Sequence, residues 1–284
     1  MPAASAQLRT GRPPADGMKR IISRDNAHYR ELKRLHASAR ERRRSGRLLL
    51  DGMHLITAYQ QRCGRPAEIV LSDSGAGRAE VVDYLASCPS GMLITQLPDA
   101  LWAELALVDT PSGIMAVAGW PQPAAVVDLA ADTVALDGVQ DPGNIGSILR
   151  SAAAAGFRQI LLSADCAQAW SPKTLRAGMG AHFQLDIHEG GDLPAFLAAY
   201  RGQSVATAVN ATADLYTAGP GAGAVTWVFG SEGQGLRAAV LAATHLQVRI
   251  PMPGACESLN VAAAAAICLF ETVRRRQRAV DGGR

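Results

Sequence analysis

Residues 225–271 decide how the second half of the chain folds, and they read VTWVFGSEGQGLRAAVLAATHLQVRIPMPGACESLNVAAAAAICLFE. The run 225–229 is short, apolar and rich in β-branched and aromatic residues, which is typical of a buried strand. Gly230, Gly233 and Gly235 follow it, and glycine allows turns with positive φ and a close approach of the backbone to a ligand. The stretch therefore predicts a strand that ends in a glycine loop.

The same stretch predicts a second strand over residues 246–250, and then an alanine-rich helix that begins at Ser258 and runs to the arginines at 274–276. Two polar loops would thus leave the same end of two neighbouring strands, which in an open α/β sheet is where ligands bind. Their side chains can hydrogen-bond a polar substrate, and they include Glu232, Glu257, Ser258 and Asn260. A pair of ordinary turns is the alternative.

Strands and helices alternate from Thr133 onward, and this alternation predicts an α/β fold with a parallel sheet for residues 132–284. The strands are expected at 133–136, 159–163, 185–188, 204–209, 225–229 and 246–250. The glycine spacing G-x-x-G-x-G at 230–235 differs from the G-x-G-x-x-G of dinucleotide-binding folds, so that class is disfavoured.

Residues 136–157, LDGVQDPGNIGSILRSAAAAGF, place a tight turn before a helix. The turn Asp-Pro-Gly-Asn is expected to deliver Asn144 as the N-cap of a helix over 145–155, which Gly156 ends. Arg150 lies nearly two turns inside that helix, on a different stripe from Asn144. Taken alone, the two residues are a capping asparagine and a surface arginine.

Three segments together resemble the signature motifs of the SpoU/TrmH family of RNA 2'-O-ribose methyltransferases, which belongs to the SPOUT superfamily. They are residues 136–157, the Gly-Ser-Glu-Gly-Gln-Gly-Leu of 230–236 and the Glu-Ser-Leu-Asn-Val of 257–261, in the family's order. The resemblance is close from residue 133 onward and weaker before it. It implies transfer of a methyl group from S-adenosylmethionine to a ribose 2'-hydroxyl.

The resemblance also implies which residues form the site. Those of the active site would be Asn144, Arg150, Glu232, Ser258 and Asn260, and those that contact S-adenosylmethionine would be Gly230, Ile250 and Leu259. Because a guanidinium normally stays protonated, Arg150 is expected to bind a phosphate and stabilise the developing alkoxide, with Glu232 as the alternative proton acceptor. The chain departs from the commonest family pattern at Ala262, where a small hydroxyl residue is usual.

Two further expectations concern the architecture that the resemblance implies. The first is a deep trefoil knot, a rare feature in which residues from about 228 to 265 thread through a preceding loop. The second is a homodimer that uses the first-motif and C-terminal helices. Small residues at 152–155 and 262–266 permit close packing of helices and are compatible with such an interface.

Residues 19–119 are expected to form a smaller α/β unit, which resembles the ribosomal-protein-like substrate-binding domain of many SpoU proteins. It opens with a basic helix over 23–44, with Ser23 or Asp25 as N-cap. Residues 1–50 carry 13 Lys/Arg and 4 Asp/Glu, a net charge of +9, whereas the remaining 234 residues carry 15 and 21, a net charge of −6. This asymmetry predicts a polyanionic partner such as structured RNA, and a solvated helix face is the alternative.

The remaining segments and the composition add the following expectations. Residues 1–18 are predicted to be a disordered tail and residues 120–131 a proline-punctuated linker. Five scattered cysteines without a C-x-x-C or a His/Cys cluster predict neither a metal site nor a disulfide framework. No apolar run approaches the ~18 residues of a membrane span, and free thiols fit a reducing cytosol, so a cytoplasmic location is expected. The histidines, His182 among them, are interpreted as structural.

The sequence therefore predicts S-adenosylmethionine-dependent methylation of a ribose 2'-hydroxyl in ribosomal RNA, a target that the front unit favours. Two alternatives stay open. One is the same reaction on tRNA, and the other is a catalytically silent RNA-binding protein on the same scaffold.

Overall fold

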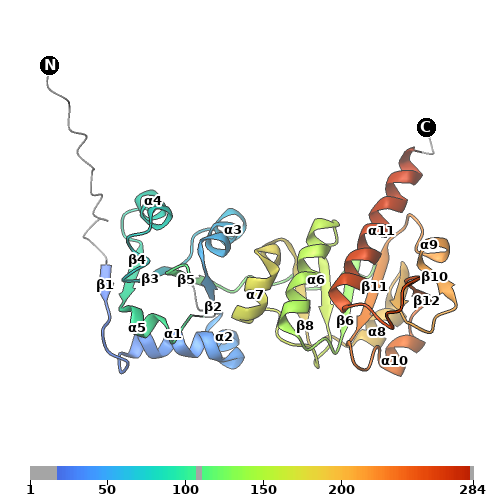
Figure 1. The fold of residues 1–284 in the computed structure, drawn as a ribbon, viewed down its shortest axis with the longest axis horizontal. Helices are drawn as coiled ribbons and strands as arrows, with labels where there is room; N and C mark the ends of the chain where they lie inside the picture. Colours follow the sequence, from blue (N-terminus) through green and yellow to red (C-terminus); the bar gives the residue numbers. More distant parts are fainter. Residues whose placement is uncertain (1–17, 107–110, 282–284) are drawn as a thin grey trace, which may run out of the picture. The chain divides into compact units, whose positions relative to one another are not determined.

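A computed structural model describes residues 18–106 and 111–281 of the 284-residue chain. The chain divides into two compact units, Met1–Trp120 and Pro121–Arg284 (Figure 1). Residues 1–17 of the expected tail lie outside the described residues, and Met18 already belongs to a strand. None of the helices within the described ranges has the length and apolar character needed to span a bilayer.

The first unit is a five-stranded sheet with helices packed against it. Its elements are β1 (Met18–Arg20), α1 (Ala27–Ala37), α2 (Ala39–Ser45), β2 (Arg47–Asp51), α3 (Met53–Cys63), β3 (Glu68–Ser72), α4 (Ala79–Ser87), β4 (Leu93–Leu97), α5 (Asp99–Trp102) and β5 (Ile114–Gly119). The strand order is β1-β4-β3-β5-β2, in which β5 runs antiparallel to both of its neighbours and the other pairs are parallel. Leu32 and Leu35 of α1 pack into the core with Val70, Met115 and Val117.

The basic segment forms two helices rather than the single helix expected over 23–44. Asn26, and not Ser23 or Asp25, caps α1, because its side-chain oxygen accepts the backbone N–H of His28 at 2.9 Å. Asparagine is among the best N-cap residues, which explains why Asn26 caps the helix although Ser23 and Asp25 lie close by.

The break between α1 and α2 lies at Ser38, whose backbone is extended and whose hydroxyl accepts the N–H of Glu41. The side chain of Arg42 is buried and donates to the carbonyl oxygens of Leu35 and His36, at 2.8 and 3.1 Å. These carbonyls belong to the last turn of α1, where no intrahelical partner exists. Arg42 therefore caps the carbonyl end of α1, and its buried side chain does not face solvent.

The second unit is a seven-stranded, fully parallel sheet. Its elements are β6 (Thr133–Asp137), α6 (Pro142–Ala154), β7 (Gln159–Leu162), α7 (Pro172–Gly178), a 3-10 helix η1 (Ala181–Gln184), β8 (Asp186–Glu189), α8 (Leu193–Ala199), β9 (Gln203–Thr207), β10 (Ala213–Asp214), α9 (Leu215–Ala218), β11 (Val225–Gly230), α10 (Ala238–Ala242), β12 (Leu246–Arg249) and α11 (Val261–Asp281). The strand order is β10-β12-β9-β11-β6-β7-β8. Every pair in this order is parallel.

The strand order corrects one expectation from the sequence. The strands β11 and β12 were expected to be neighbours, but β9 pairs with both and lies between them. Parallel strands are joined by long crossover connections. Two strands that are consecutive in the sequence therefore need not be neighbours in the sheet. The loops that follow β9, β11 and β12, rather than β11 and β12 alone, therefore meet at the carboxyl ends of the strands.

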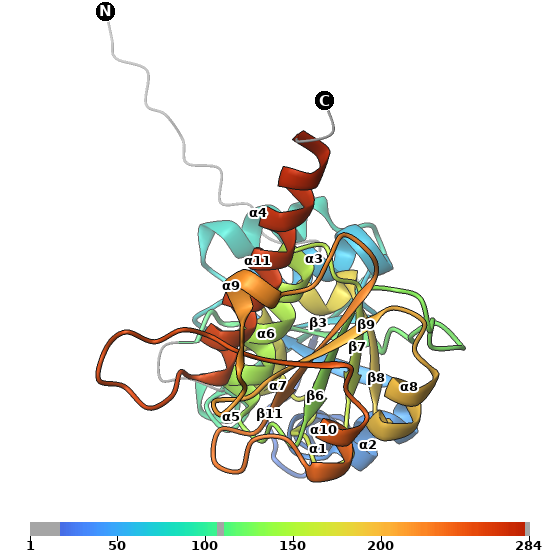
Figure 2. The same cartoon turned by 90° about the vertical axis from the view of Figure 1, so that its right-hand side faces the viewer.

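Helices cover both faces of the second sheet. Side chains of α8 and α10, such as Phe196 and Val240, pack with Ala135 and Val228 on one face. Trp227 points to the other face, where its indole N–H donates to the hydroxyl of Thr272 on α11 at 2.9 Å. Figure 2 shows α8 on one side of the strands and α6 and α11 on the other. The alternation along β11 is the cause, since successive side chains of a strand point to opposite faces.

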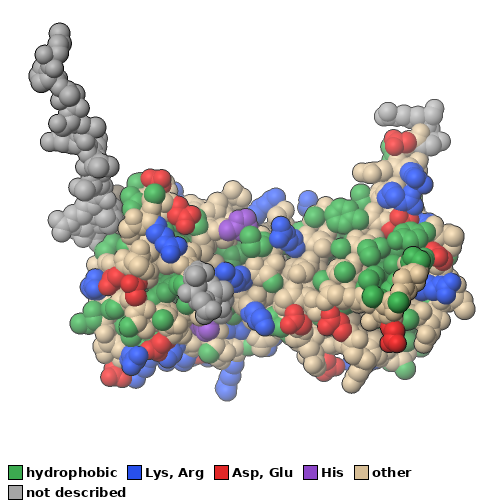
Figure 3. Space-filling view, viewed as in Figure 1, with side chains coloured by type: hydrophobic (Ala, Val, Ile, Leu, Met, Phe, Trp, Pro, Cys, Tyr) green, Lys and Arg blue, Asp and Glu red, His purple; other side chains and the backbone are tan. Residues whose placement is uncertain are grey.

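The long helix α11 combines a charged anchor with an apolar exposed stripe. Arg276 forms a bidentate pair with Asp132, with nitrogen–oxygen distances of 2.6 and 2.7 Å. Hydrophobic side chains gather over α11 in the view of Figure 3, and Phe270 on this helix is 48% exposed. The anchor holds the second half of the helix against the start of β6.

Candidate active site

The first motif delivers Asn144 inside a helix rather than ahead of it. Asp141 is the N-cap of α6, accepting the backbone N–H of Asn144 at 2.8 Å, and Pro142 is the first helical residue. Proline suits that position because its φ is preset and its missing N–H is not needed there. Asn144 therefore lies in the first turn and is not the expected N-cap. Its side chain is released from capping and can bind elsewhere.

The glycine loop after β11 closes on itself. The backbone groups of Ser231 and Gly235 exchange hydrogen bonds of 3.1 and 2.9 Å. Gly235 has φ +68°, and a Cβ on Gly230 would lie 2.3 Å from the carbonyl carbon of Gly235. Only glycine fits these two positions without strain. The loop consequently holds Glu232 at its tip.

Three of the predicted site residues meet in one hydrogen-bond network, hereafter the Asn–Glu–Asn network. The Nδ2 atoms of Asn144 and Asn260 both donate to Oε1 of Glu232, at 2.8 and 2.7 Å. Nδ2 of Asn260 also donates to Oδ1 of Asn144 at 2.9 Å. The network thus joins one side chain from each of the three motif segments, and charge-assisted bonds to the carboxylate strengthen it.

Asn260 has a second role as the N-cap of α11. Its Oδ1 accepts the backbone N–H groups of Ala262 and Ala263, at 3.0 and 3.3 Å. The helix therefore begins at Val261 and not at the expected Ser258. The departure from the family pattern at Ala262 leaves this contact intact, because the backbone and not the side chain makes it. The positive end of the helix dipole also faces the carboxylate of Glu232.

A pocket of about 520 Å³ opens beside the network. Five of the eight predicted site residues line it, namely Gly230, Glu232, Ile250, Ser258 and Leu259. Asn144 and Asn260 lie next to it through their bonds to Glu232. Its size falls within the range of about 300–1,000 Å³ that is usual for small-molecule sites.

Arg150 is not part of this assembly. It is exposed on α6, and within the described residues it makes no hydrogen bond or ion pair. The structure therefore brings Asn144, Glu232 and Asn260 into contact and leaves Arg150 available to a partner outside the chain.

The sequence reading missed one wall of the pocket. The last residue of β9, Thr207, and residues 208–210 after it line the pocket together with Gln247 and Met252. The strand was expected to extend to residue 209, whereas β9 ends at Thr207, so the loop was hidden inside a predicted strand. The polar residue Asn210 after a β-rich run was the available signal.

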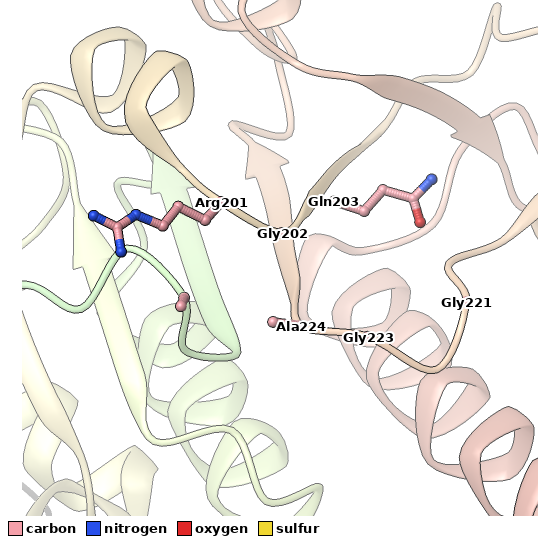
Figure 4. Close-up of a pocket in the computed structure, with 7 residues that line it drawn as sticks. Arg201, Gly202, Gln203, Gly221, Gly223 and Ala224 are labelled. Carbon is pink, nitrogen blue, oxygen red and sulfur yellow. The ribbon is translucent and has the colours of Figure 1, made fainter.

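A second, smaller hollow of about 250 Å³ lies where β9 and β11 begin, away from the network. Its lining consists of glycines, Ala130, Ala224, Arg201 and Gln203. The side chains of Arg201 and Gln203 extend away from each other (Figure 4). No polar side chains converge there, so it lacks the character of a binding site.

The larger pocket fits S-adenosylmethionine in chemistry as well as in size. Its floor of glycine backbone can hydrogen-bond a polar ligand, and Leu236, Leu241 and Val248 add apolar surface for a flat ring. Among the described residues no group of three or more His, Cys, Asp or Glu could hold a metal ion.

Comparison with known proteins identifies the family. Residues 132–270 match the model of the SpoU rRNA Methylase family. Over 256 residues the chain is 31% identical to the 23S rRNA (guanosine(2553)-2'-O)-methyltransferase RlmP of Bacillus subtilis, which covers 89% of this chain and 98% of that protein. The chain belongs to the SpoU family.

Two more methyltransferases match along nearly the whole chain. An uncharacterized tRNA/rRNA methyltransferase of Synechocystis sp. is 33% identical over 295 residues, covering 95% of this chain and 99% of that protein. The crystal structure of the SpoU methyltransferase AviRb from Streptomyces viridochromogenes in complex with AdoMet has a TM-score of 0.78 at 25% identity. That alignment covers 89% of this chain and 98% of AviRb.

The comparisons confirm several predictions made from the sequence. The chain is an α/β SpoU enzyme, an RNA 2'-O-ribose methyltransferase, and its cofactor is S-adenosylmethionine. The trefoil knot, the division of the chain at 119 and 131, and the roles of the eight site residues stay predictions.

Proposed function

We propose that this enzyme methylates a ribose 2'-hydroxyl of 23S ribosomal RNA, with S-adenosylmethionine bound in the pocket beside the glycine loop. The Asn–Glu–Asn network at the pocket's edge is the observation that carries the proposal. S-adenosylmethionine supplies a methyl group already activated by its sulfonium charge. The protein must therefore align the ribose oxygen with that methyl group and handle one proton.

The pocket residues would divide the binding of the cofactor between backbone and apolar contacts. Gly230 has no side chain, so its main-chain atoms line the pocket directly, and Ile250 and Leu259 add apolar side chains. Ser258 adds a hydroxyl that can donate or accept a hydrogen bond. These four residues form the binding site in our proposal.

Glu232 would order the site and also accept the proton. Its Oε1 atom is engaged by Asn144 and Asn260, whereas Oε2 has no hydrogen-bond partner among the described residues. A carboxylate held by two amide donors on one oxygen can still take up a proton on the other. Asn144 and Asn260 keep that oxygen oriented.

Arg150 would bind the phosphate next to the target ribose and stabilise the developing alkoxide. It is exposed and unpaired among the described residues, and its planar fork matches a phosphate. Arg150→Lys keeps the charge but loses the fork, so we expect kcat to fall. Arg158→Lys, the same change at an exposed arginine after α6, is the matched control. A wild-type kcat in Arg150→Lys would contradict this role.

The first unit would dock the RNA. Arg30, Arg34 and Arg40 of α1 and α2 are exposed, and within the described part of the chain no ion pair neutralises them. Exposed arginines of this kind contribute affinity that weakens with salt. The relative named as a 23S rRNA methyltransferase matches along this unit as well, which favours ribosomal RNA over tRNA.

The enzyme is also proposed to be a cytoplasmic homodimer. Ala263 and Phe270 are exposed on α11 at a spacing of seven residues, so they lie on one stripe of the helix. An apolar stripe of this kind is typical of a surface that a second copy covers. Sedimentation at micromolar concentration tests the assembly, and a monomer would overturn it.

Methylation with tritiated S-adenosylmethionine tests the main proposal. The substrates would be purified 23S rRNA, 16S rRNA and tRNA from a strain that lacks the gene. We expect label in 23S rRNA, lost in Glu232→Gln. Label in tRNA alone would favour the same chemistry on tRNA. If calorimetry showed cofactor binding but none of the three RNAs were labelled, the proposed 23S rRNA target would be wrong.

A further inference from the structure

The glycine loop returns to the sheet at an ion pair between a buried aspartate and an exposed arginine, which the mechanism above does not use. Asp137 is the last residue of β6 and is 1% exposed. It pairs in register with Gly230, the last residue of β11, where the loop begins. Arg237 is the first residue after the loop, and it binds Asp137 across 100 positions of sequence.

Arg237 holds Asp137 with its backbone as well as its side chain. Its backbone N–H donates to Oδ2 at 2.9 Å, and its Nε donates to Oδ1 at 2.7 Å. A buried carboxylate is costly without partners, so these two donors compensate its desolvation. The side-chain contact therefore also fixes where the backbone of residue 237 lies.

The consequence is a loop with both ends attached to the same point of the sheet. It leaves at Gly230 beside Asp137, and it returns at Arg237 bound to Asp137. Residues 230–236 between these ends all line the pocket, and Glu232 at the tip carries the Asn–Glu–Asn network. Neither Asp137 nor Arg237 lines the pocket itself.

We propose that Asp137 and Arg237 are positioning residues for methyl transfer, which fix the glycine loop so that it binds S-adenosylmethionine and presents Glu232. This inference rests on the proposed use of the larger pocket for the cofactor. It assigns the ion pair an effect on cofactor affinity and on the rate, transmitted through the loop and not through contact with either substrate.

The chain offers a matched control at the other end of the same strand. Asp132 precedes β6 and forms a bidentate pair with Arg276, and Val225 at the start of β11 donates to it at 2.9 Å. Both pairs join an aspartate beside β6 to an arginine far along the chain. Only the pair at the end of β6 touches the glycine loop, so only that pair should affect the cofactor.

A double-mutant cycle on the full-length protein tests the proposal. The variants are Asp137→Asn, Arg237→Lys, Arg237→Ala and the double change Asp137→Asn with Arg237→Ala, compared with Arg276→Ala. For each, calorimetry gives the dissociation constant of S-adenosylmethionine, kinetics gives kcat and KM, and melting gives Tm. Arg237→Lys and Asp137→Asn are the milder changes, which keep the test open if Arg237→Ala does not fold.

We expect Arg237→Ala and Asp137→Asn each to weaken cofactor binding about tenfold or more, with strong non-additivity in the double variant. Arg237→Lys should recover part of the affinity. Arg276→Ala should lower Tm without changing the dissociation constant. If the Asp137 and Arg237 variants lower Tm but bind the cofactor as the wild type does, the pair is only structural and the proposal fails. A wild-type protein that binds no cofactor would instead refute the pocket assignment.

Discussion

The buried histidine His182 makes the second unit sensitive to acid. Its Nε2 lies 2.8 Å from the carbonyl oxygen of Ala169, so Nε2 carries the proton of the neutral ring. Nδ1 is buried and has no hydrogen-bond partner among the described residues. A second proton would have to go there, beside the ring of Trp170 at a centroid distance of 5.3 Å. Burial lowers the pKa of His182 to about 4 for this reason.

The sign of the effect follows from the two states. A histidine in the unfolded chain takes up a proton near pH 6.5, whereas His182 in the folded protein does so only near its pKa of about 4. Between these values the unfolded state binds more protons, so the free energy of unfolding falls as the pH falls. The linkage relation gives a loss of about 2 kcal/mol between pH 7 and pH 5, and about 3 kcal/mol by pH 4.

Urea unfolding at about pH 7 and about pH 5 measures this loss, and the comparison is between the wild type and His182→Gln. Glutamine does not titrate, and its amide can donate to the carbonyl oxygen of Ala169. We expect the free energy of unfolding of His182→Gln to fall by about 2 kcal/mol less than that of the wild type between the two pH values. Other titrating groups contribute equally to both proteins and cancel. Equal losses in the two proteins would refute the reasoning.

Two further predictions concern the other unit and the network. The hydrogen bond to Glu68 raises the pKa of His28, so this histidine stabilises the first unit below about pH 6.5 and loses that effect as the pH rises through its raised pKa. In urea unfolding, the stability advantage of the wild type over His28→Gln should therefore be larger at about pH 6 than at about pH 8. An equal advantage at the two pH values would contradict this prediction. Asn144→Asp replaces the donor 2.8 Å from Oε1 of Glu232 with a second carboxylate, so kcat/KM should fall about a hundredfold, and an unchanged kcat/KM would contradict the role of the network.

The sequence predicted the elements of the second unit well because their signals are local. Strands β6, β7, β9, β11 and β12 are short apolar runs separated by helices, and that alternation is readable without any contact information. The helix starts were wrong by about three residues at both α6 and α11. In each case two capping residues stand close together, Asp141 with Asn144 and Ser258 with Asn260, and the local pattern does not rank them.

The order of the strands and the contacts between motifs could not be predicted from local patterns. The insertion of β9 between β11 and β12 exposes residues 207–210 to the pocket, and no periodicity records it. The bond between Asn144 and Asn260 spans 116 positions. The family resemblance indicated which residues belong to the site, whereas the contacts of the Asn–Glu–Asn network became visible only in the structure.

The two aspartates at the ends of β6, each bound to an arginine, should have different consequences for function. Asp132 binds Arg276, which lies 15 residues after Val261 and hence roughly 22 Å along α11 from the end that meets Glu232. We expect the packing of the helix to absorb a change at that distance before it reaches the pocket. Asp137 binds Arg237, which is separated from the pocket wall by a single peptide bond at Leu236. We therefore expect the pair at one end of the strand to stabilise the fold and the pair at the other end to position the site, because their distances to the glycine loop differ.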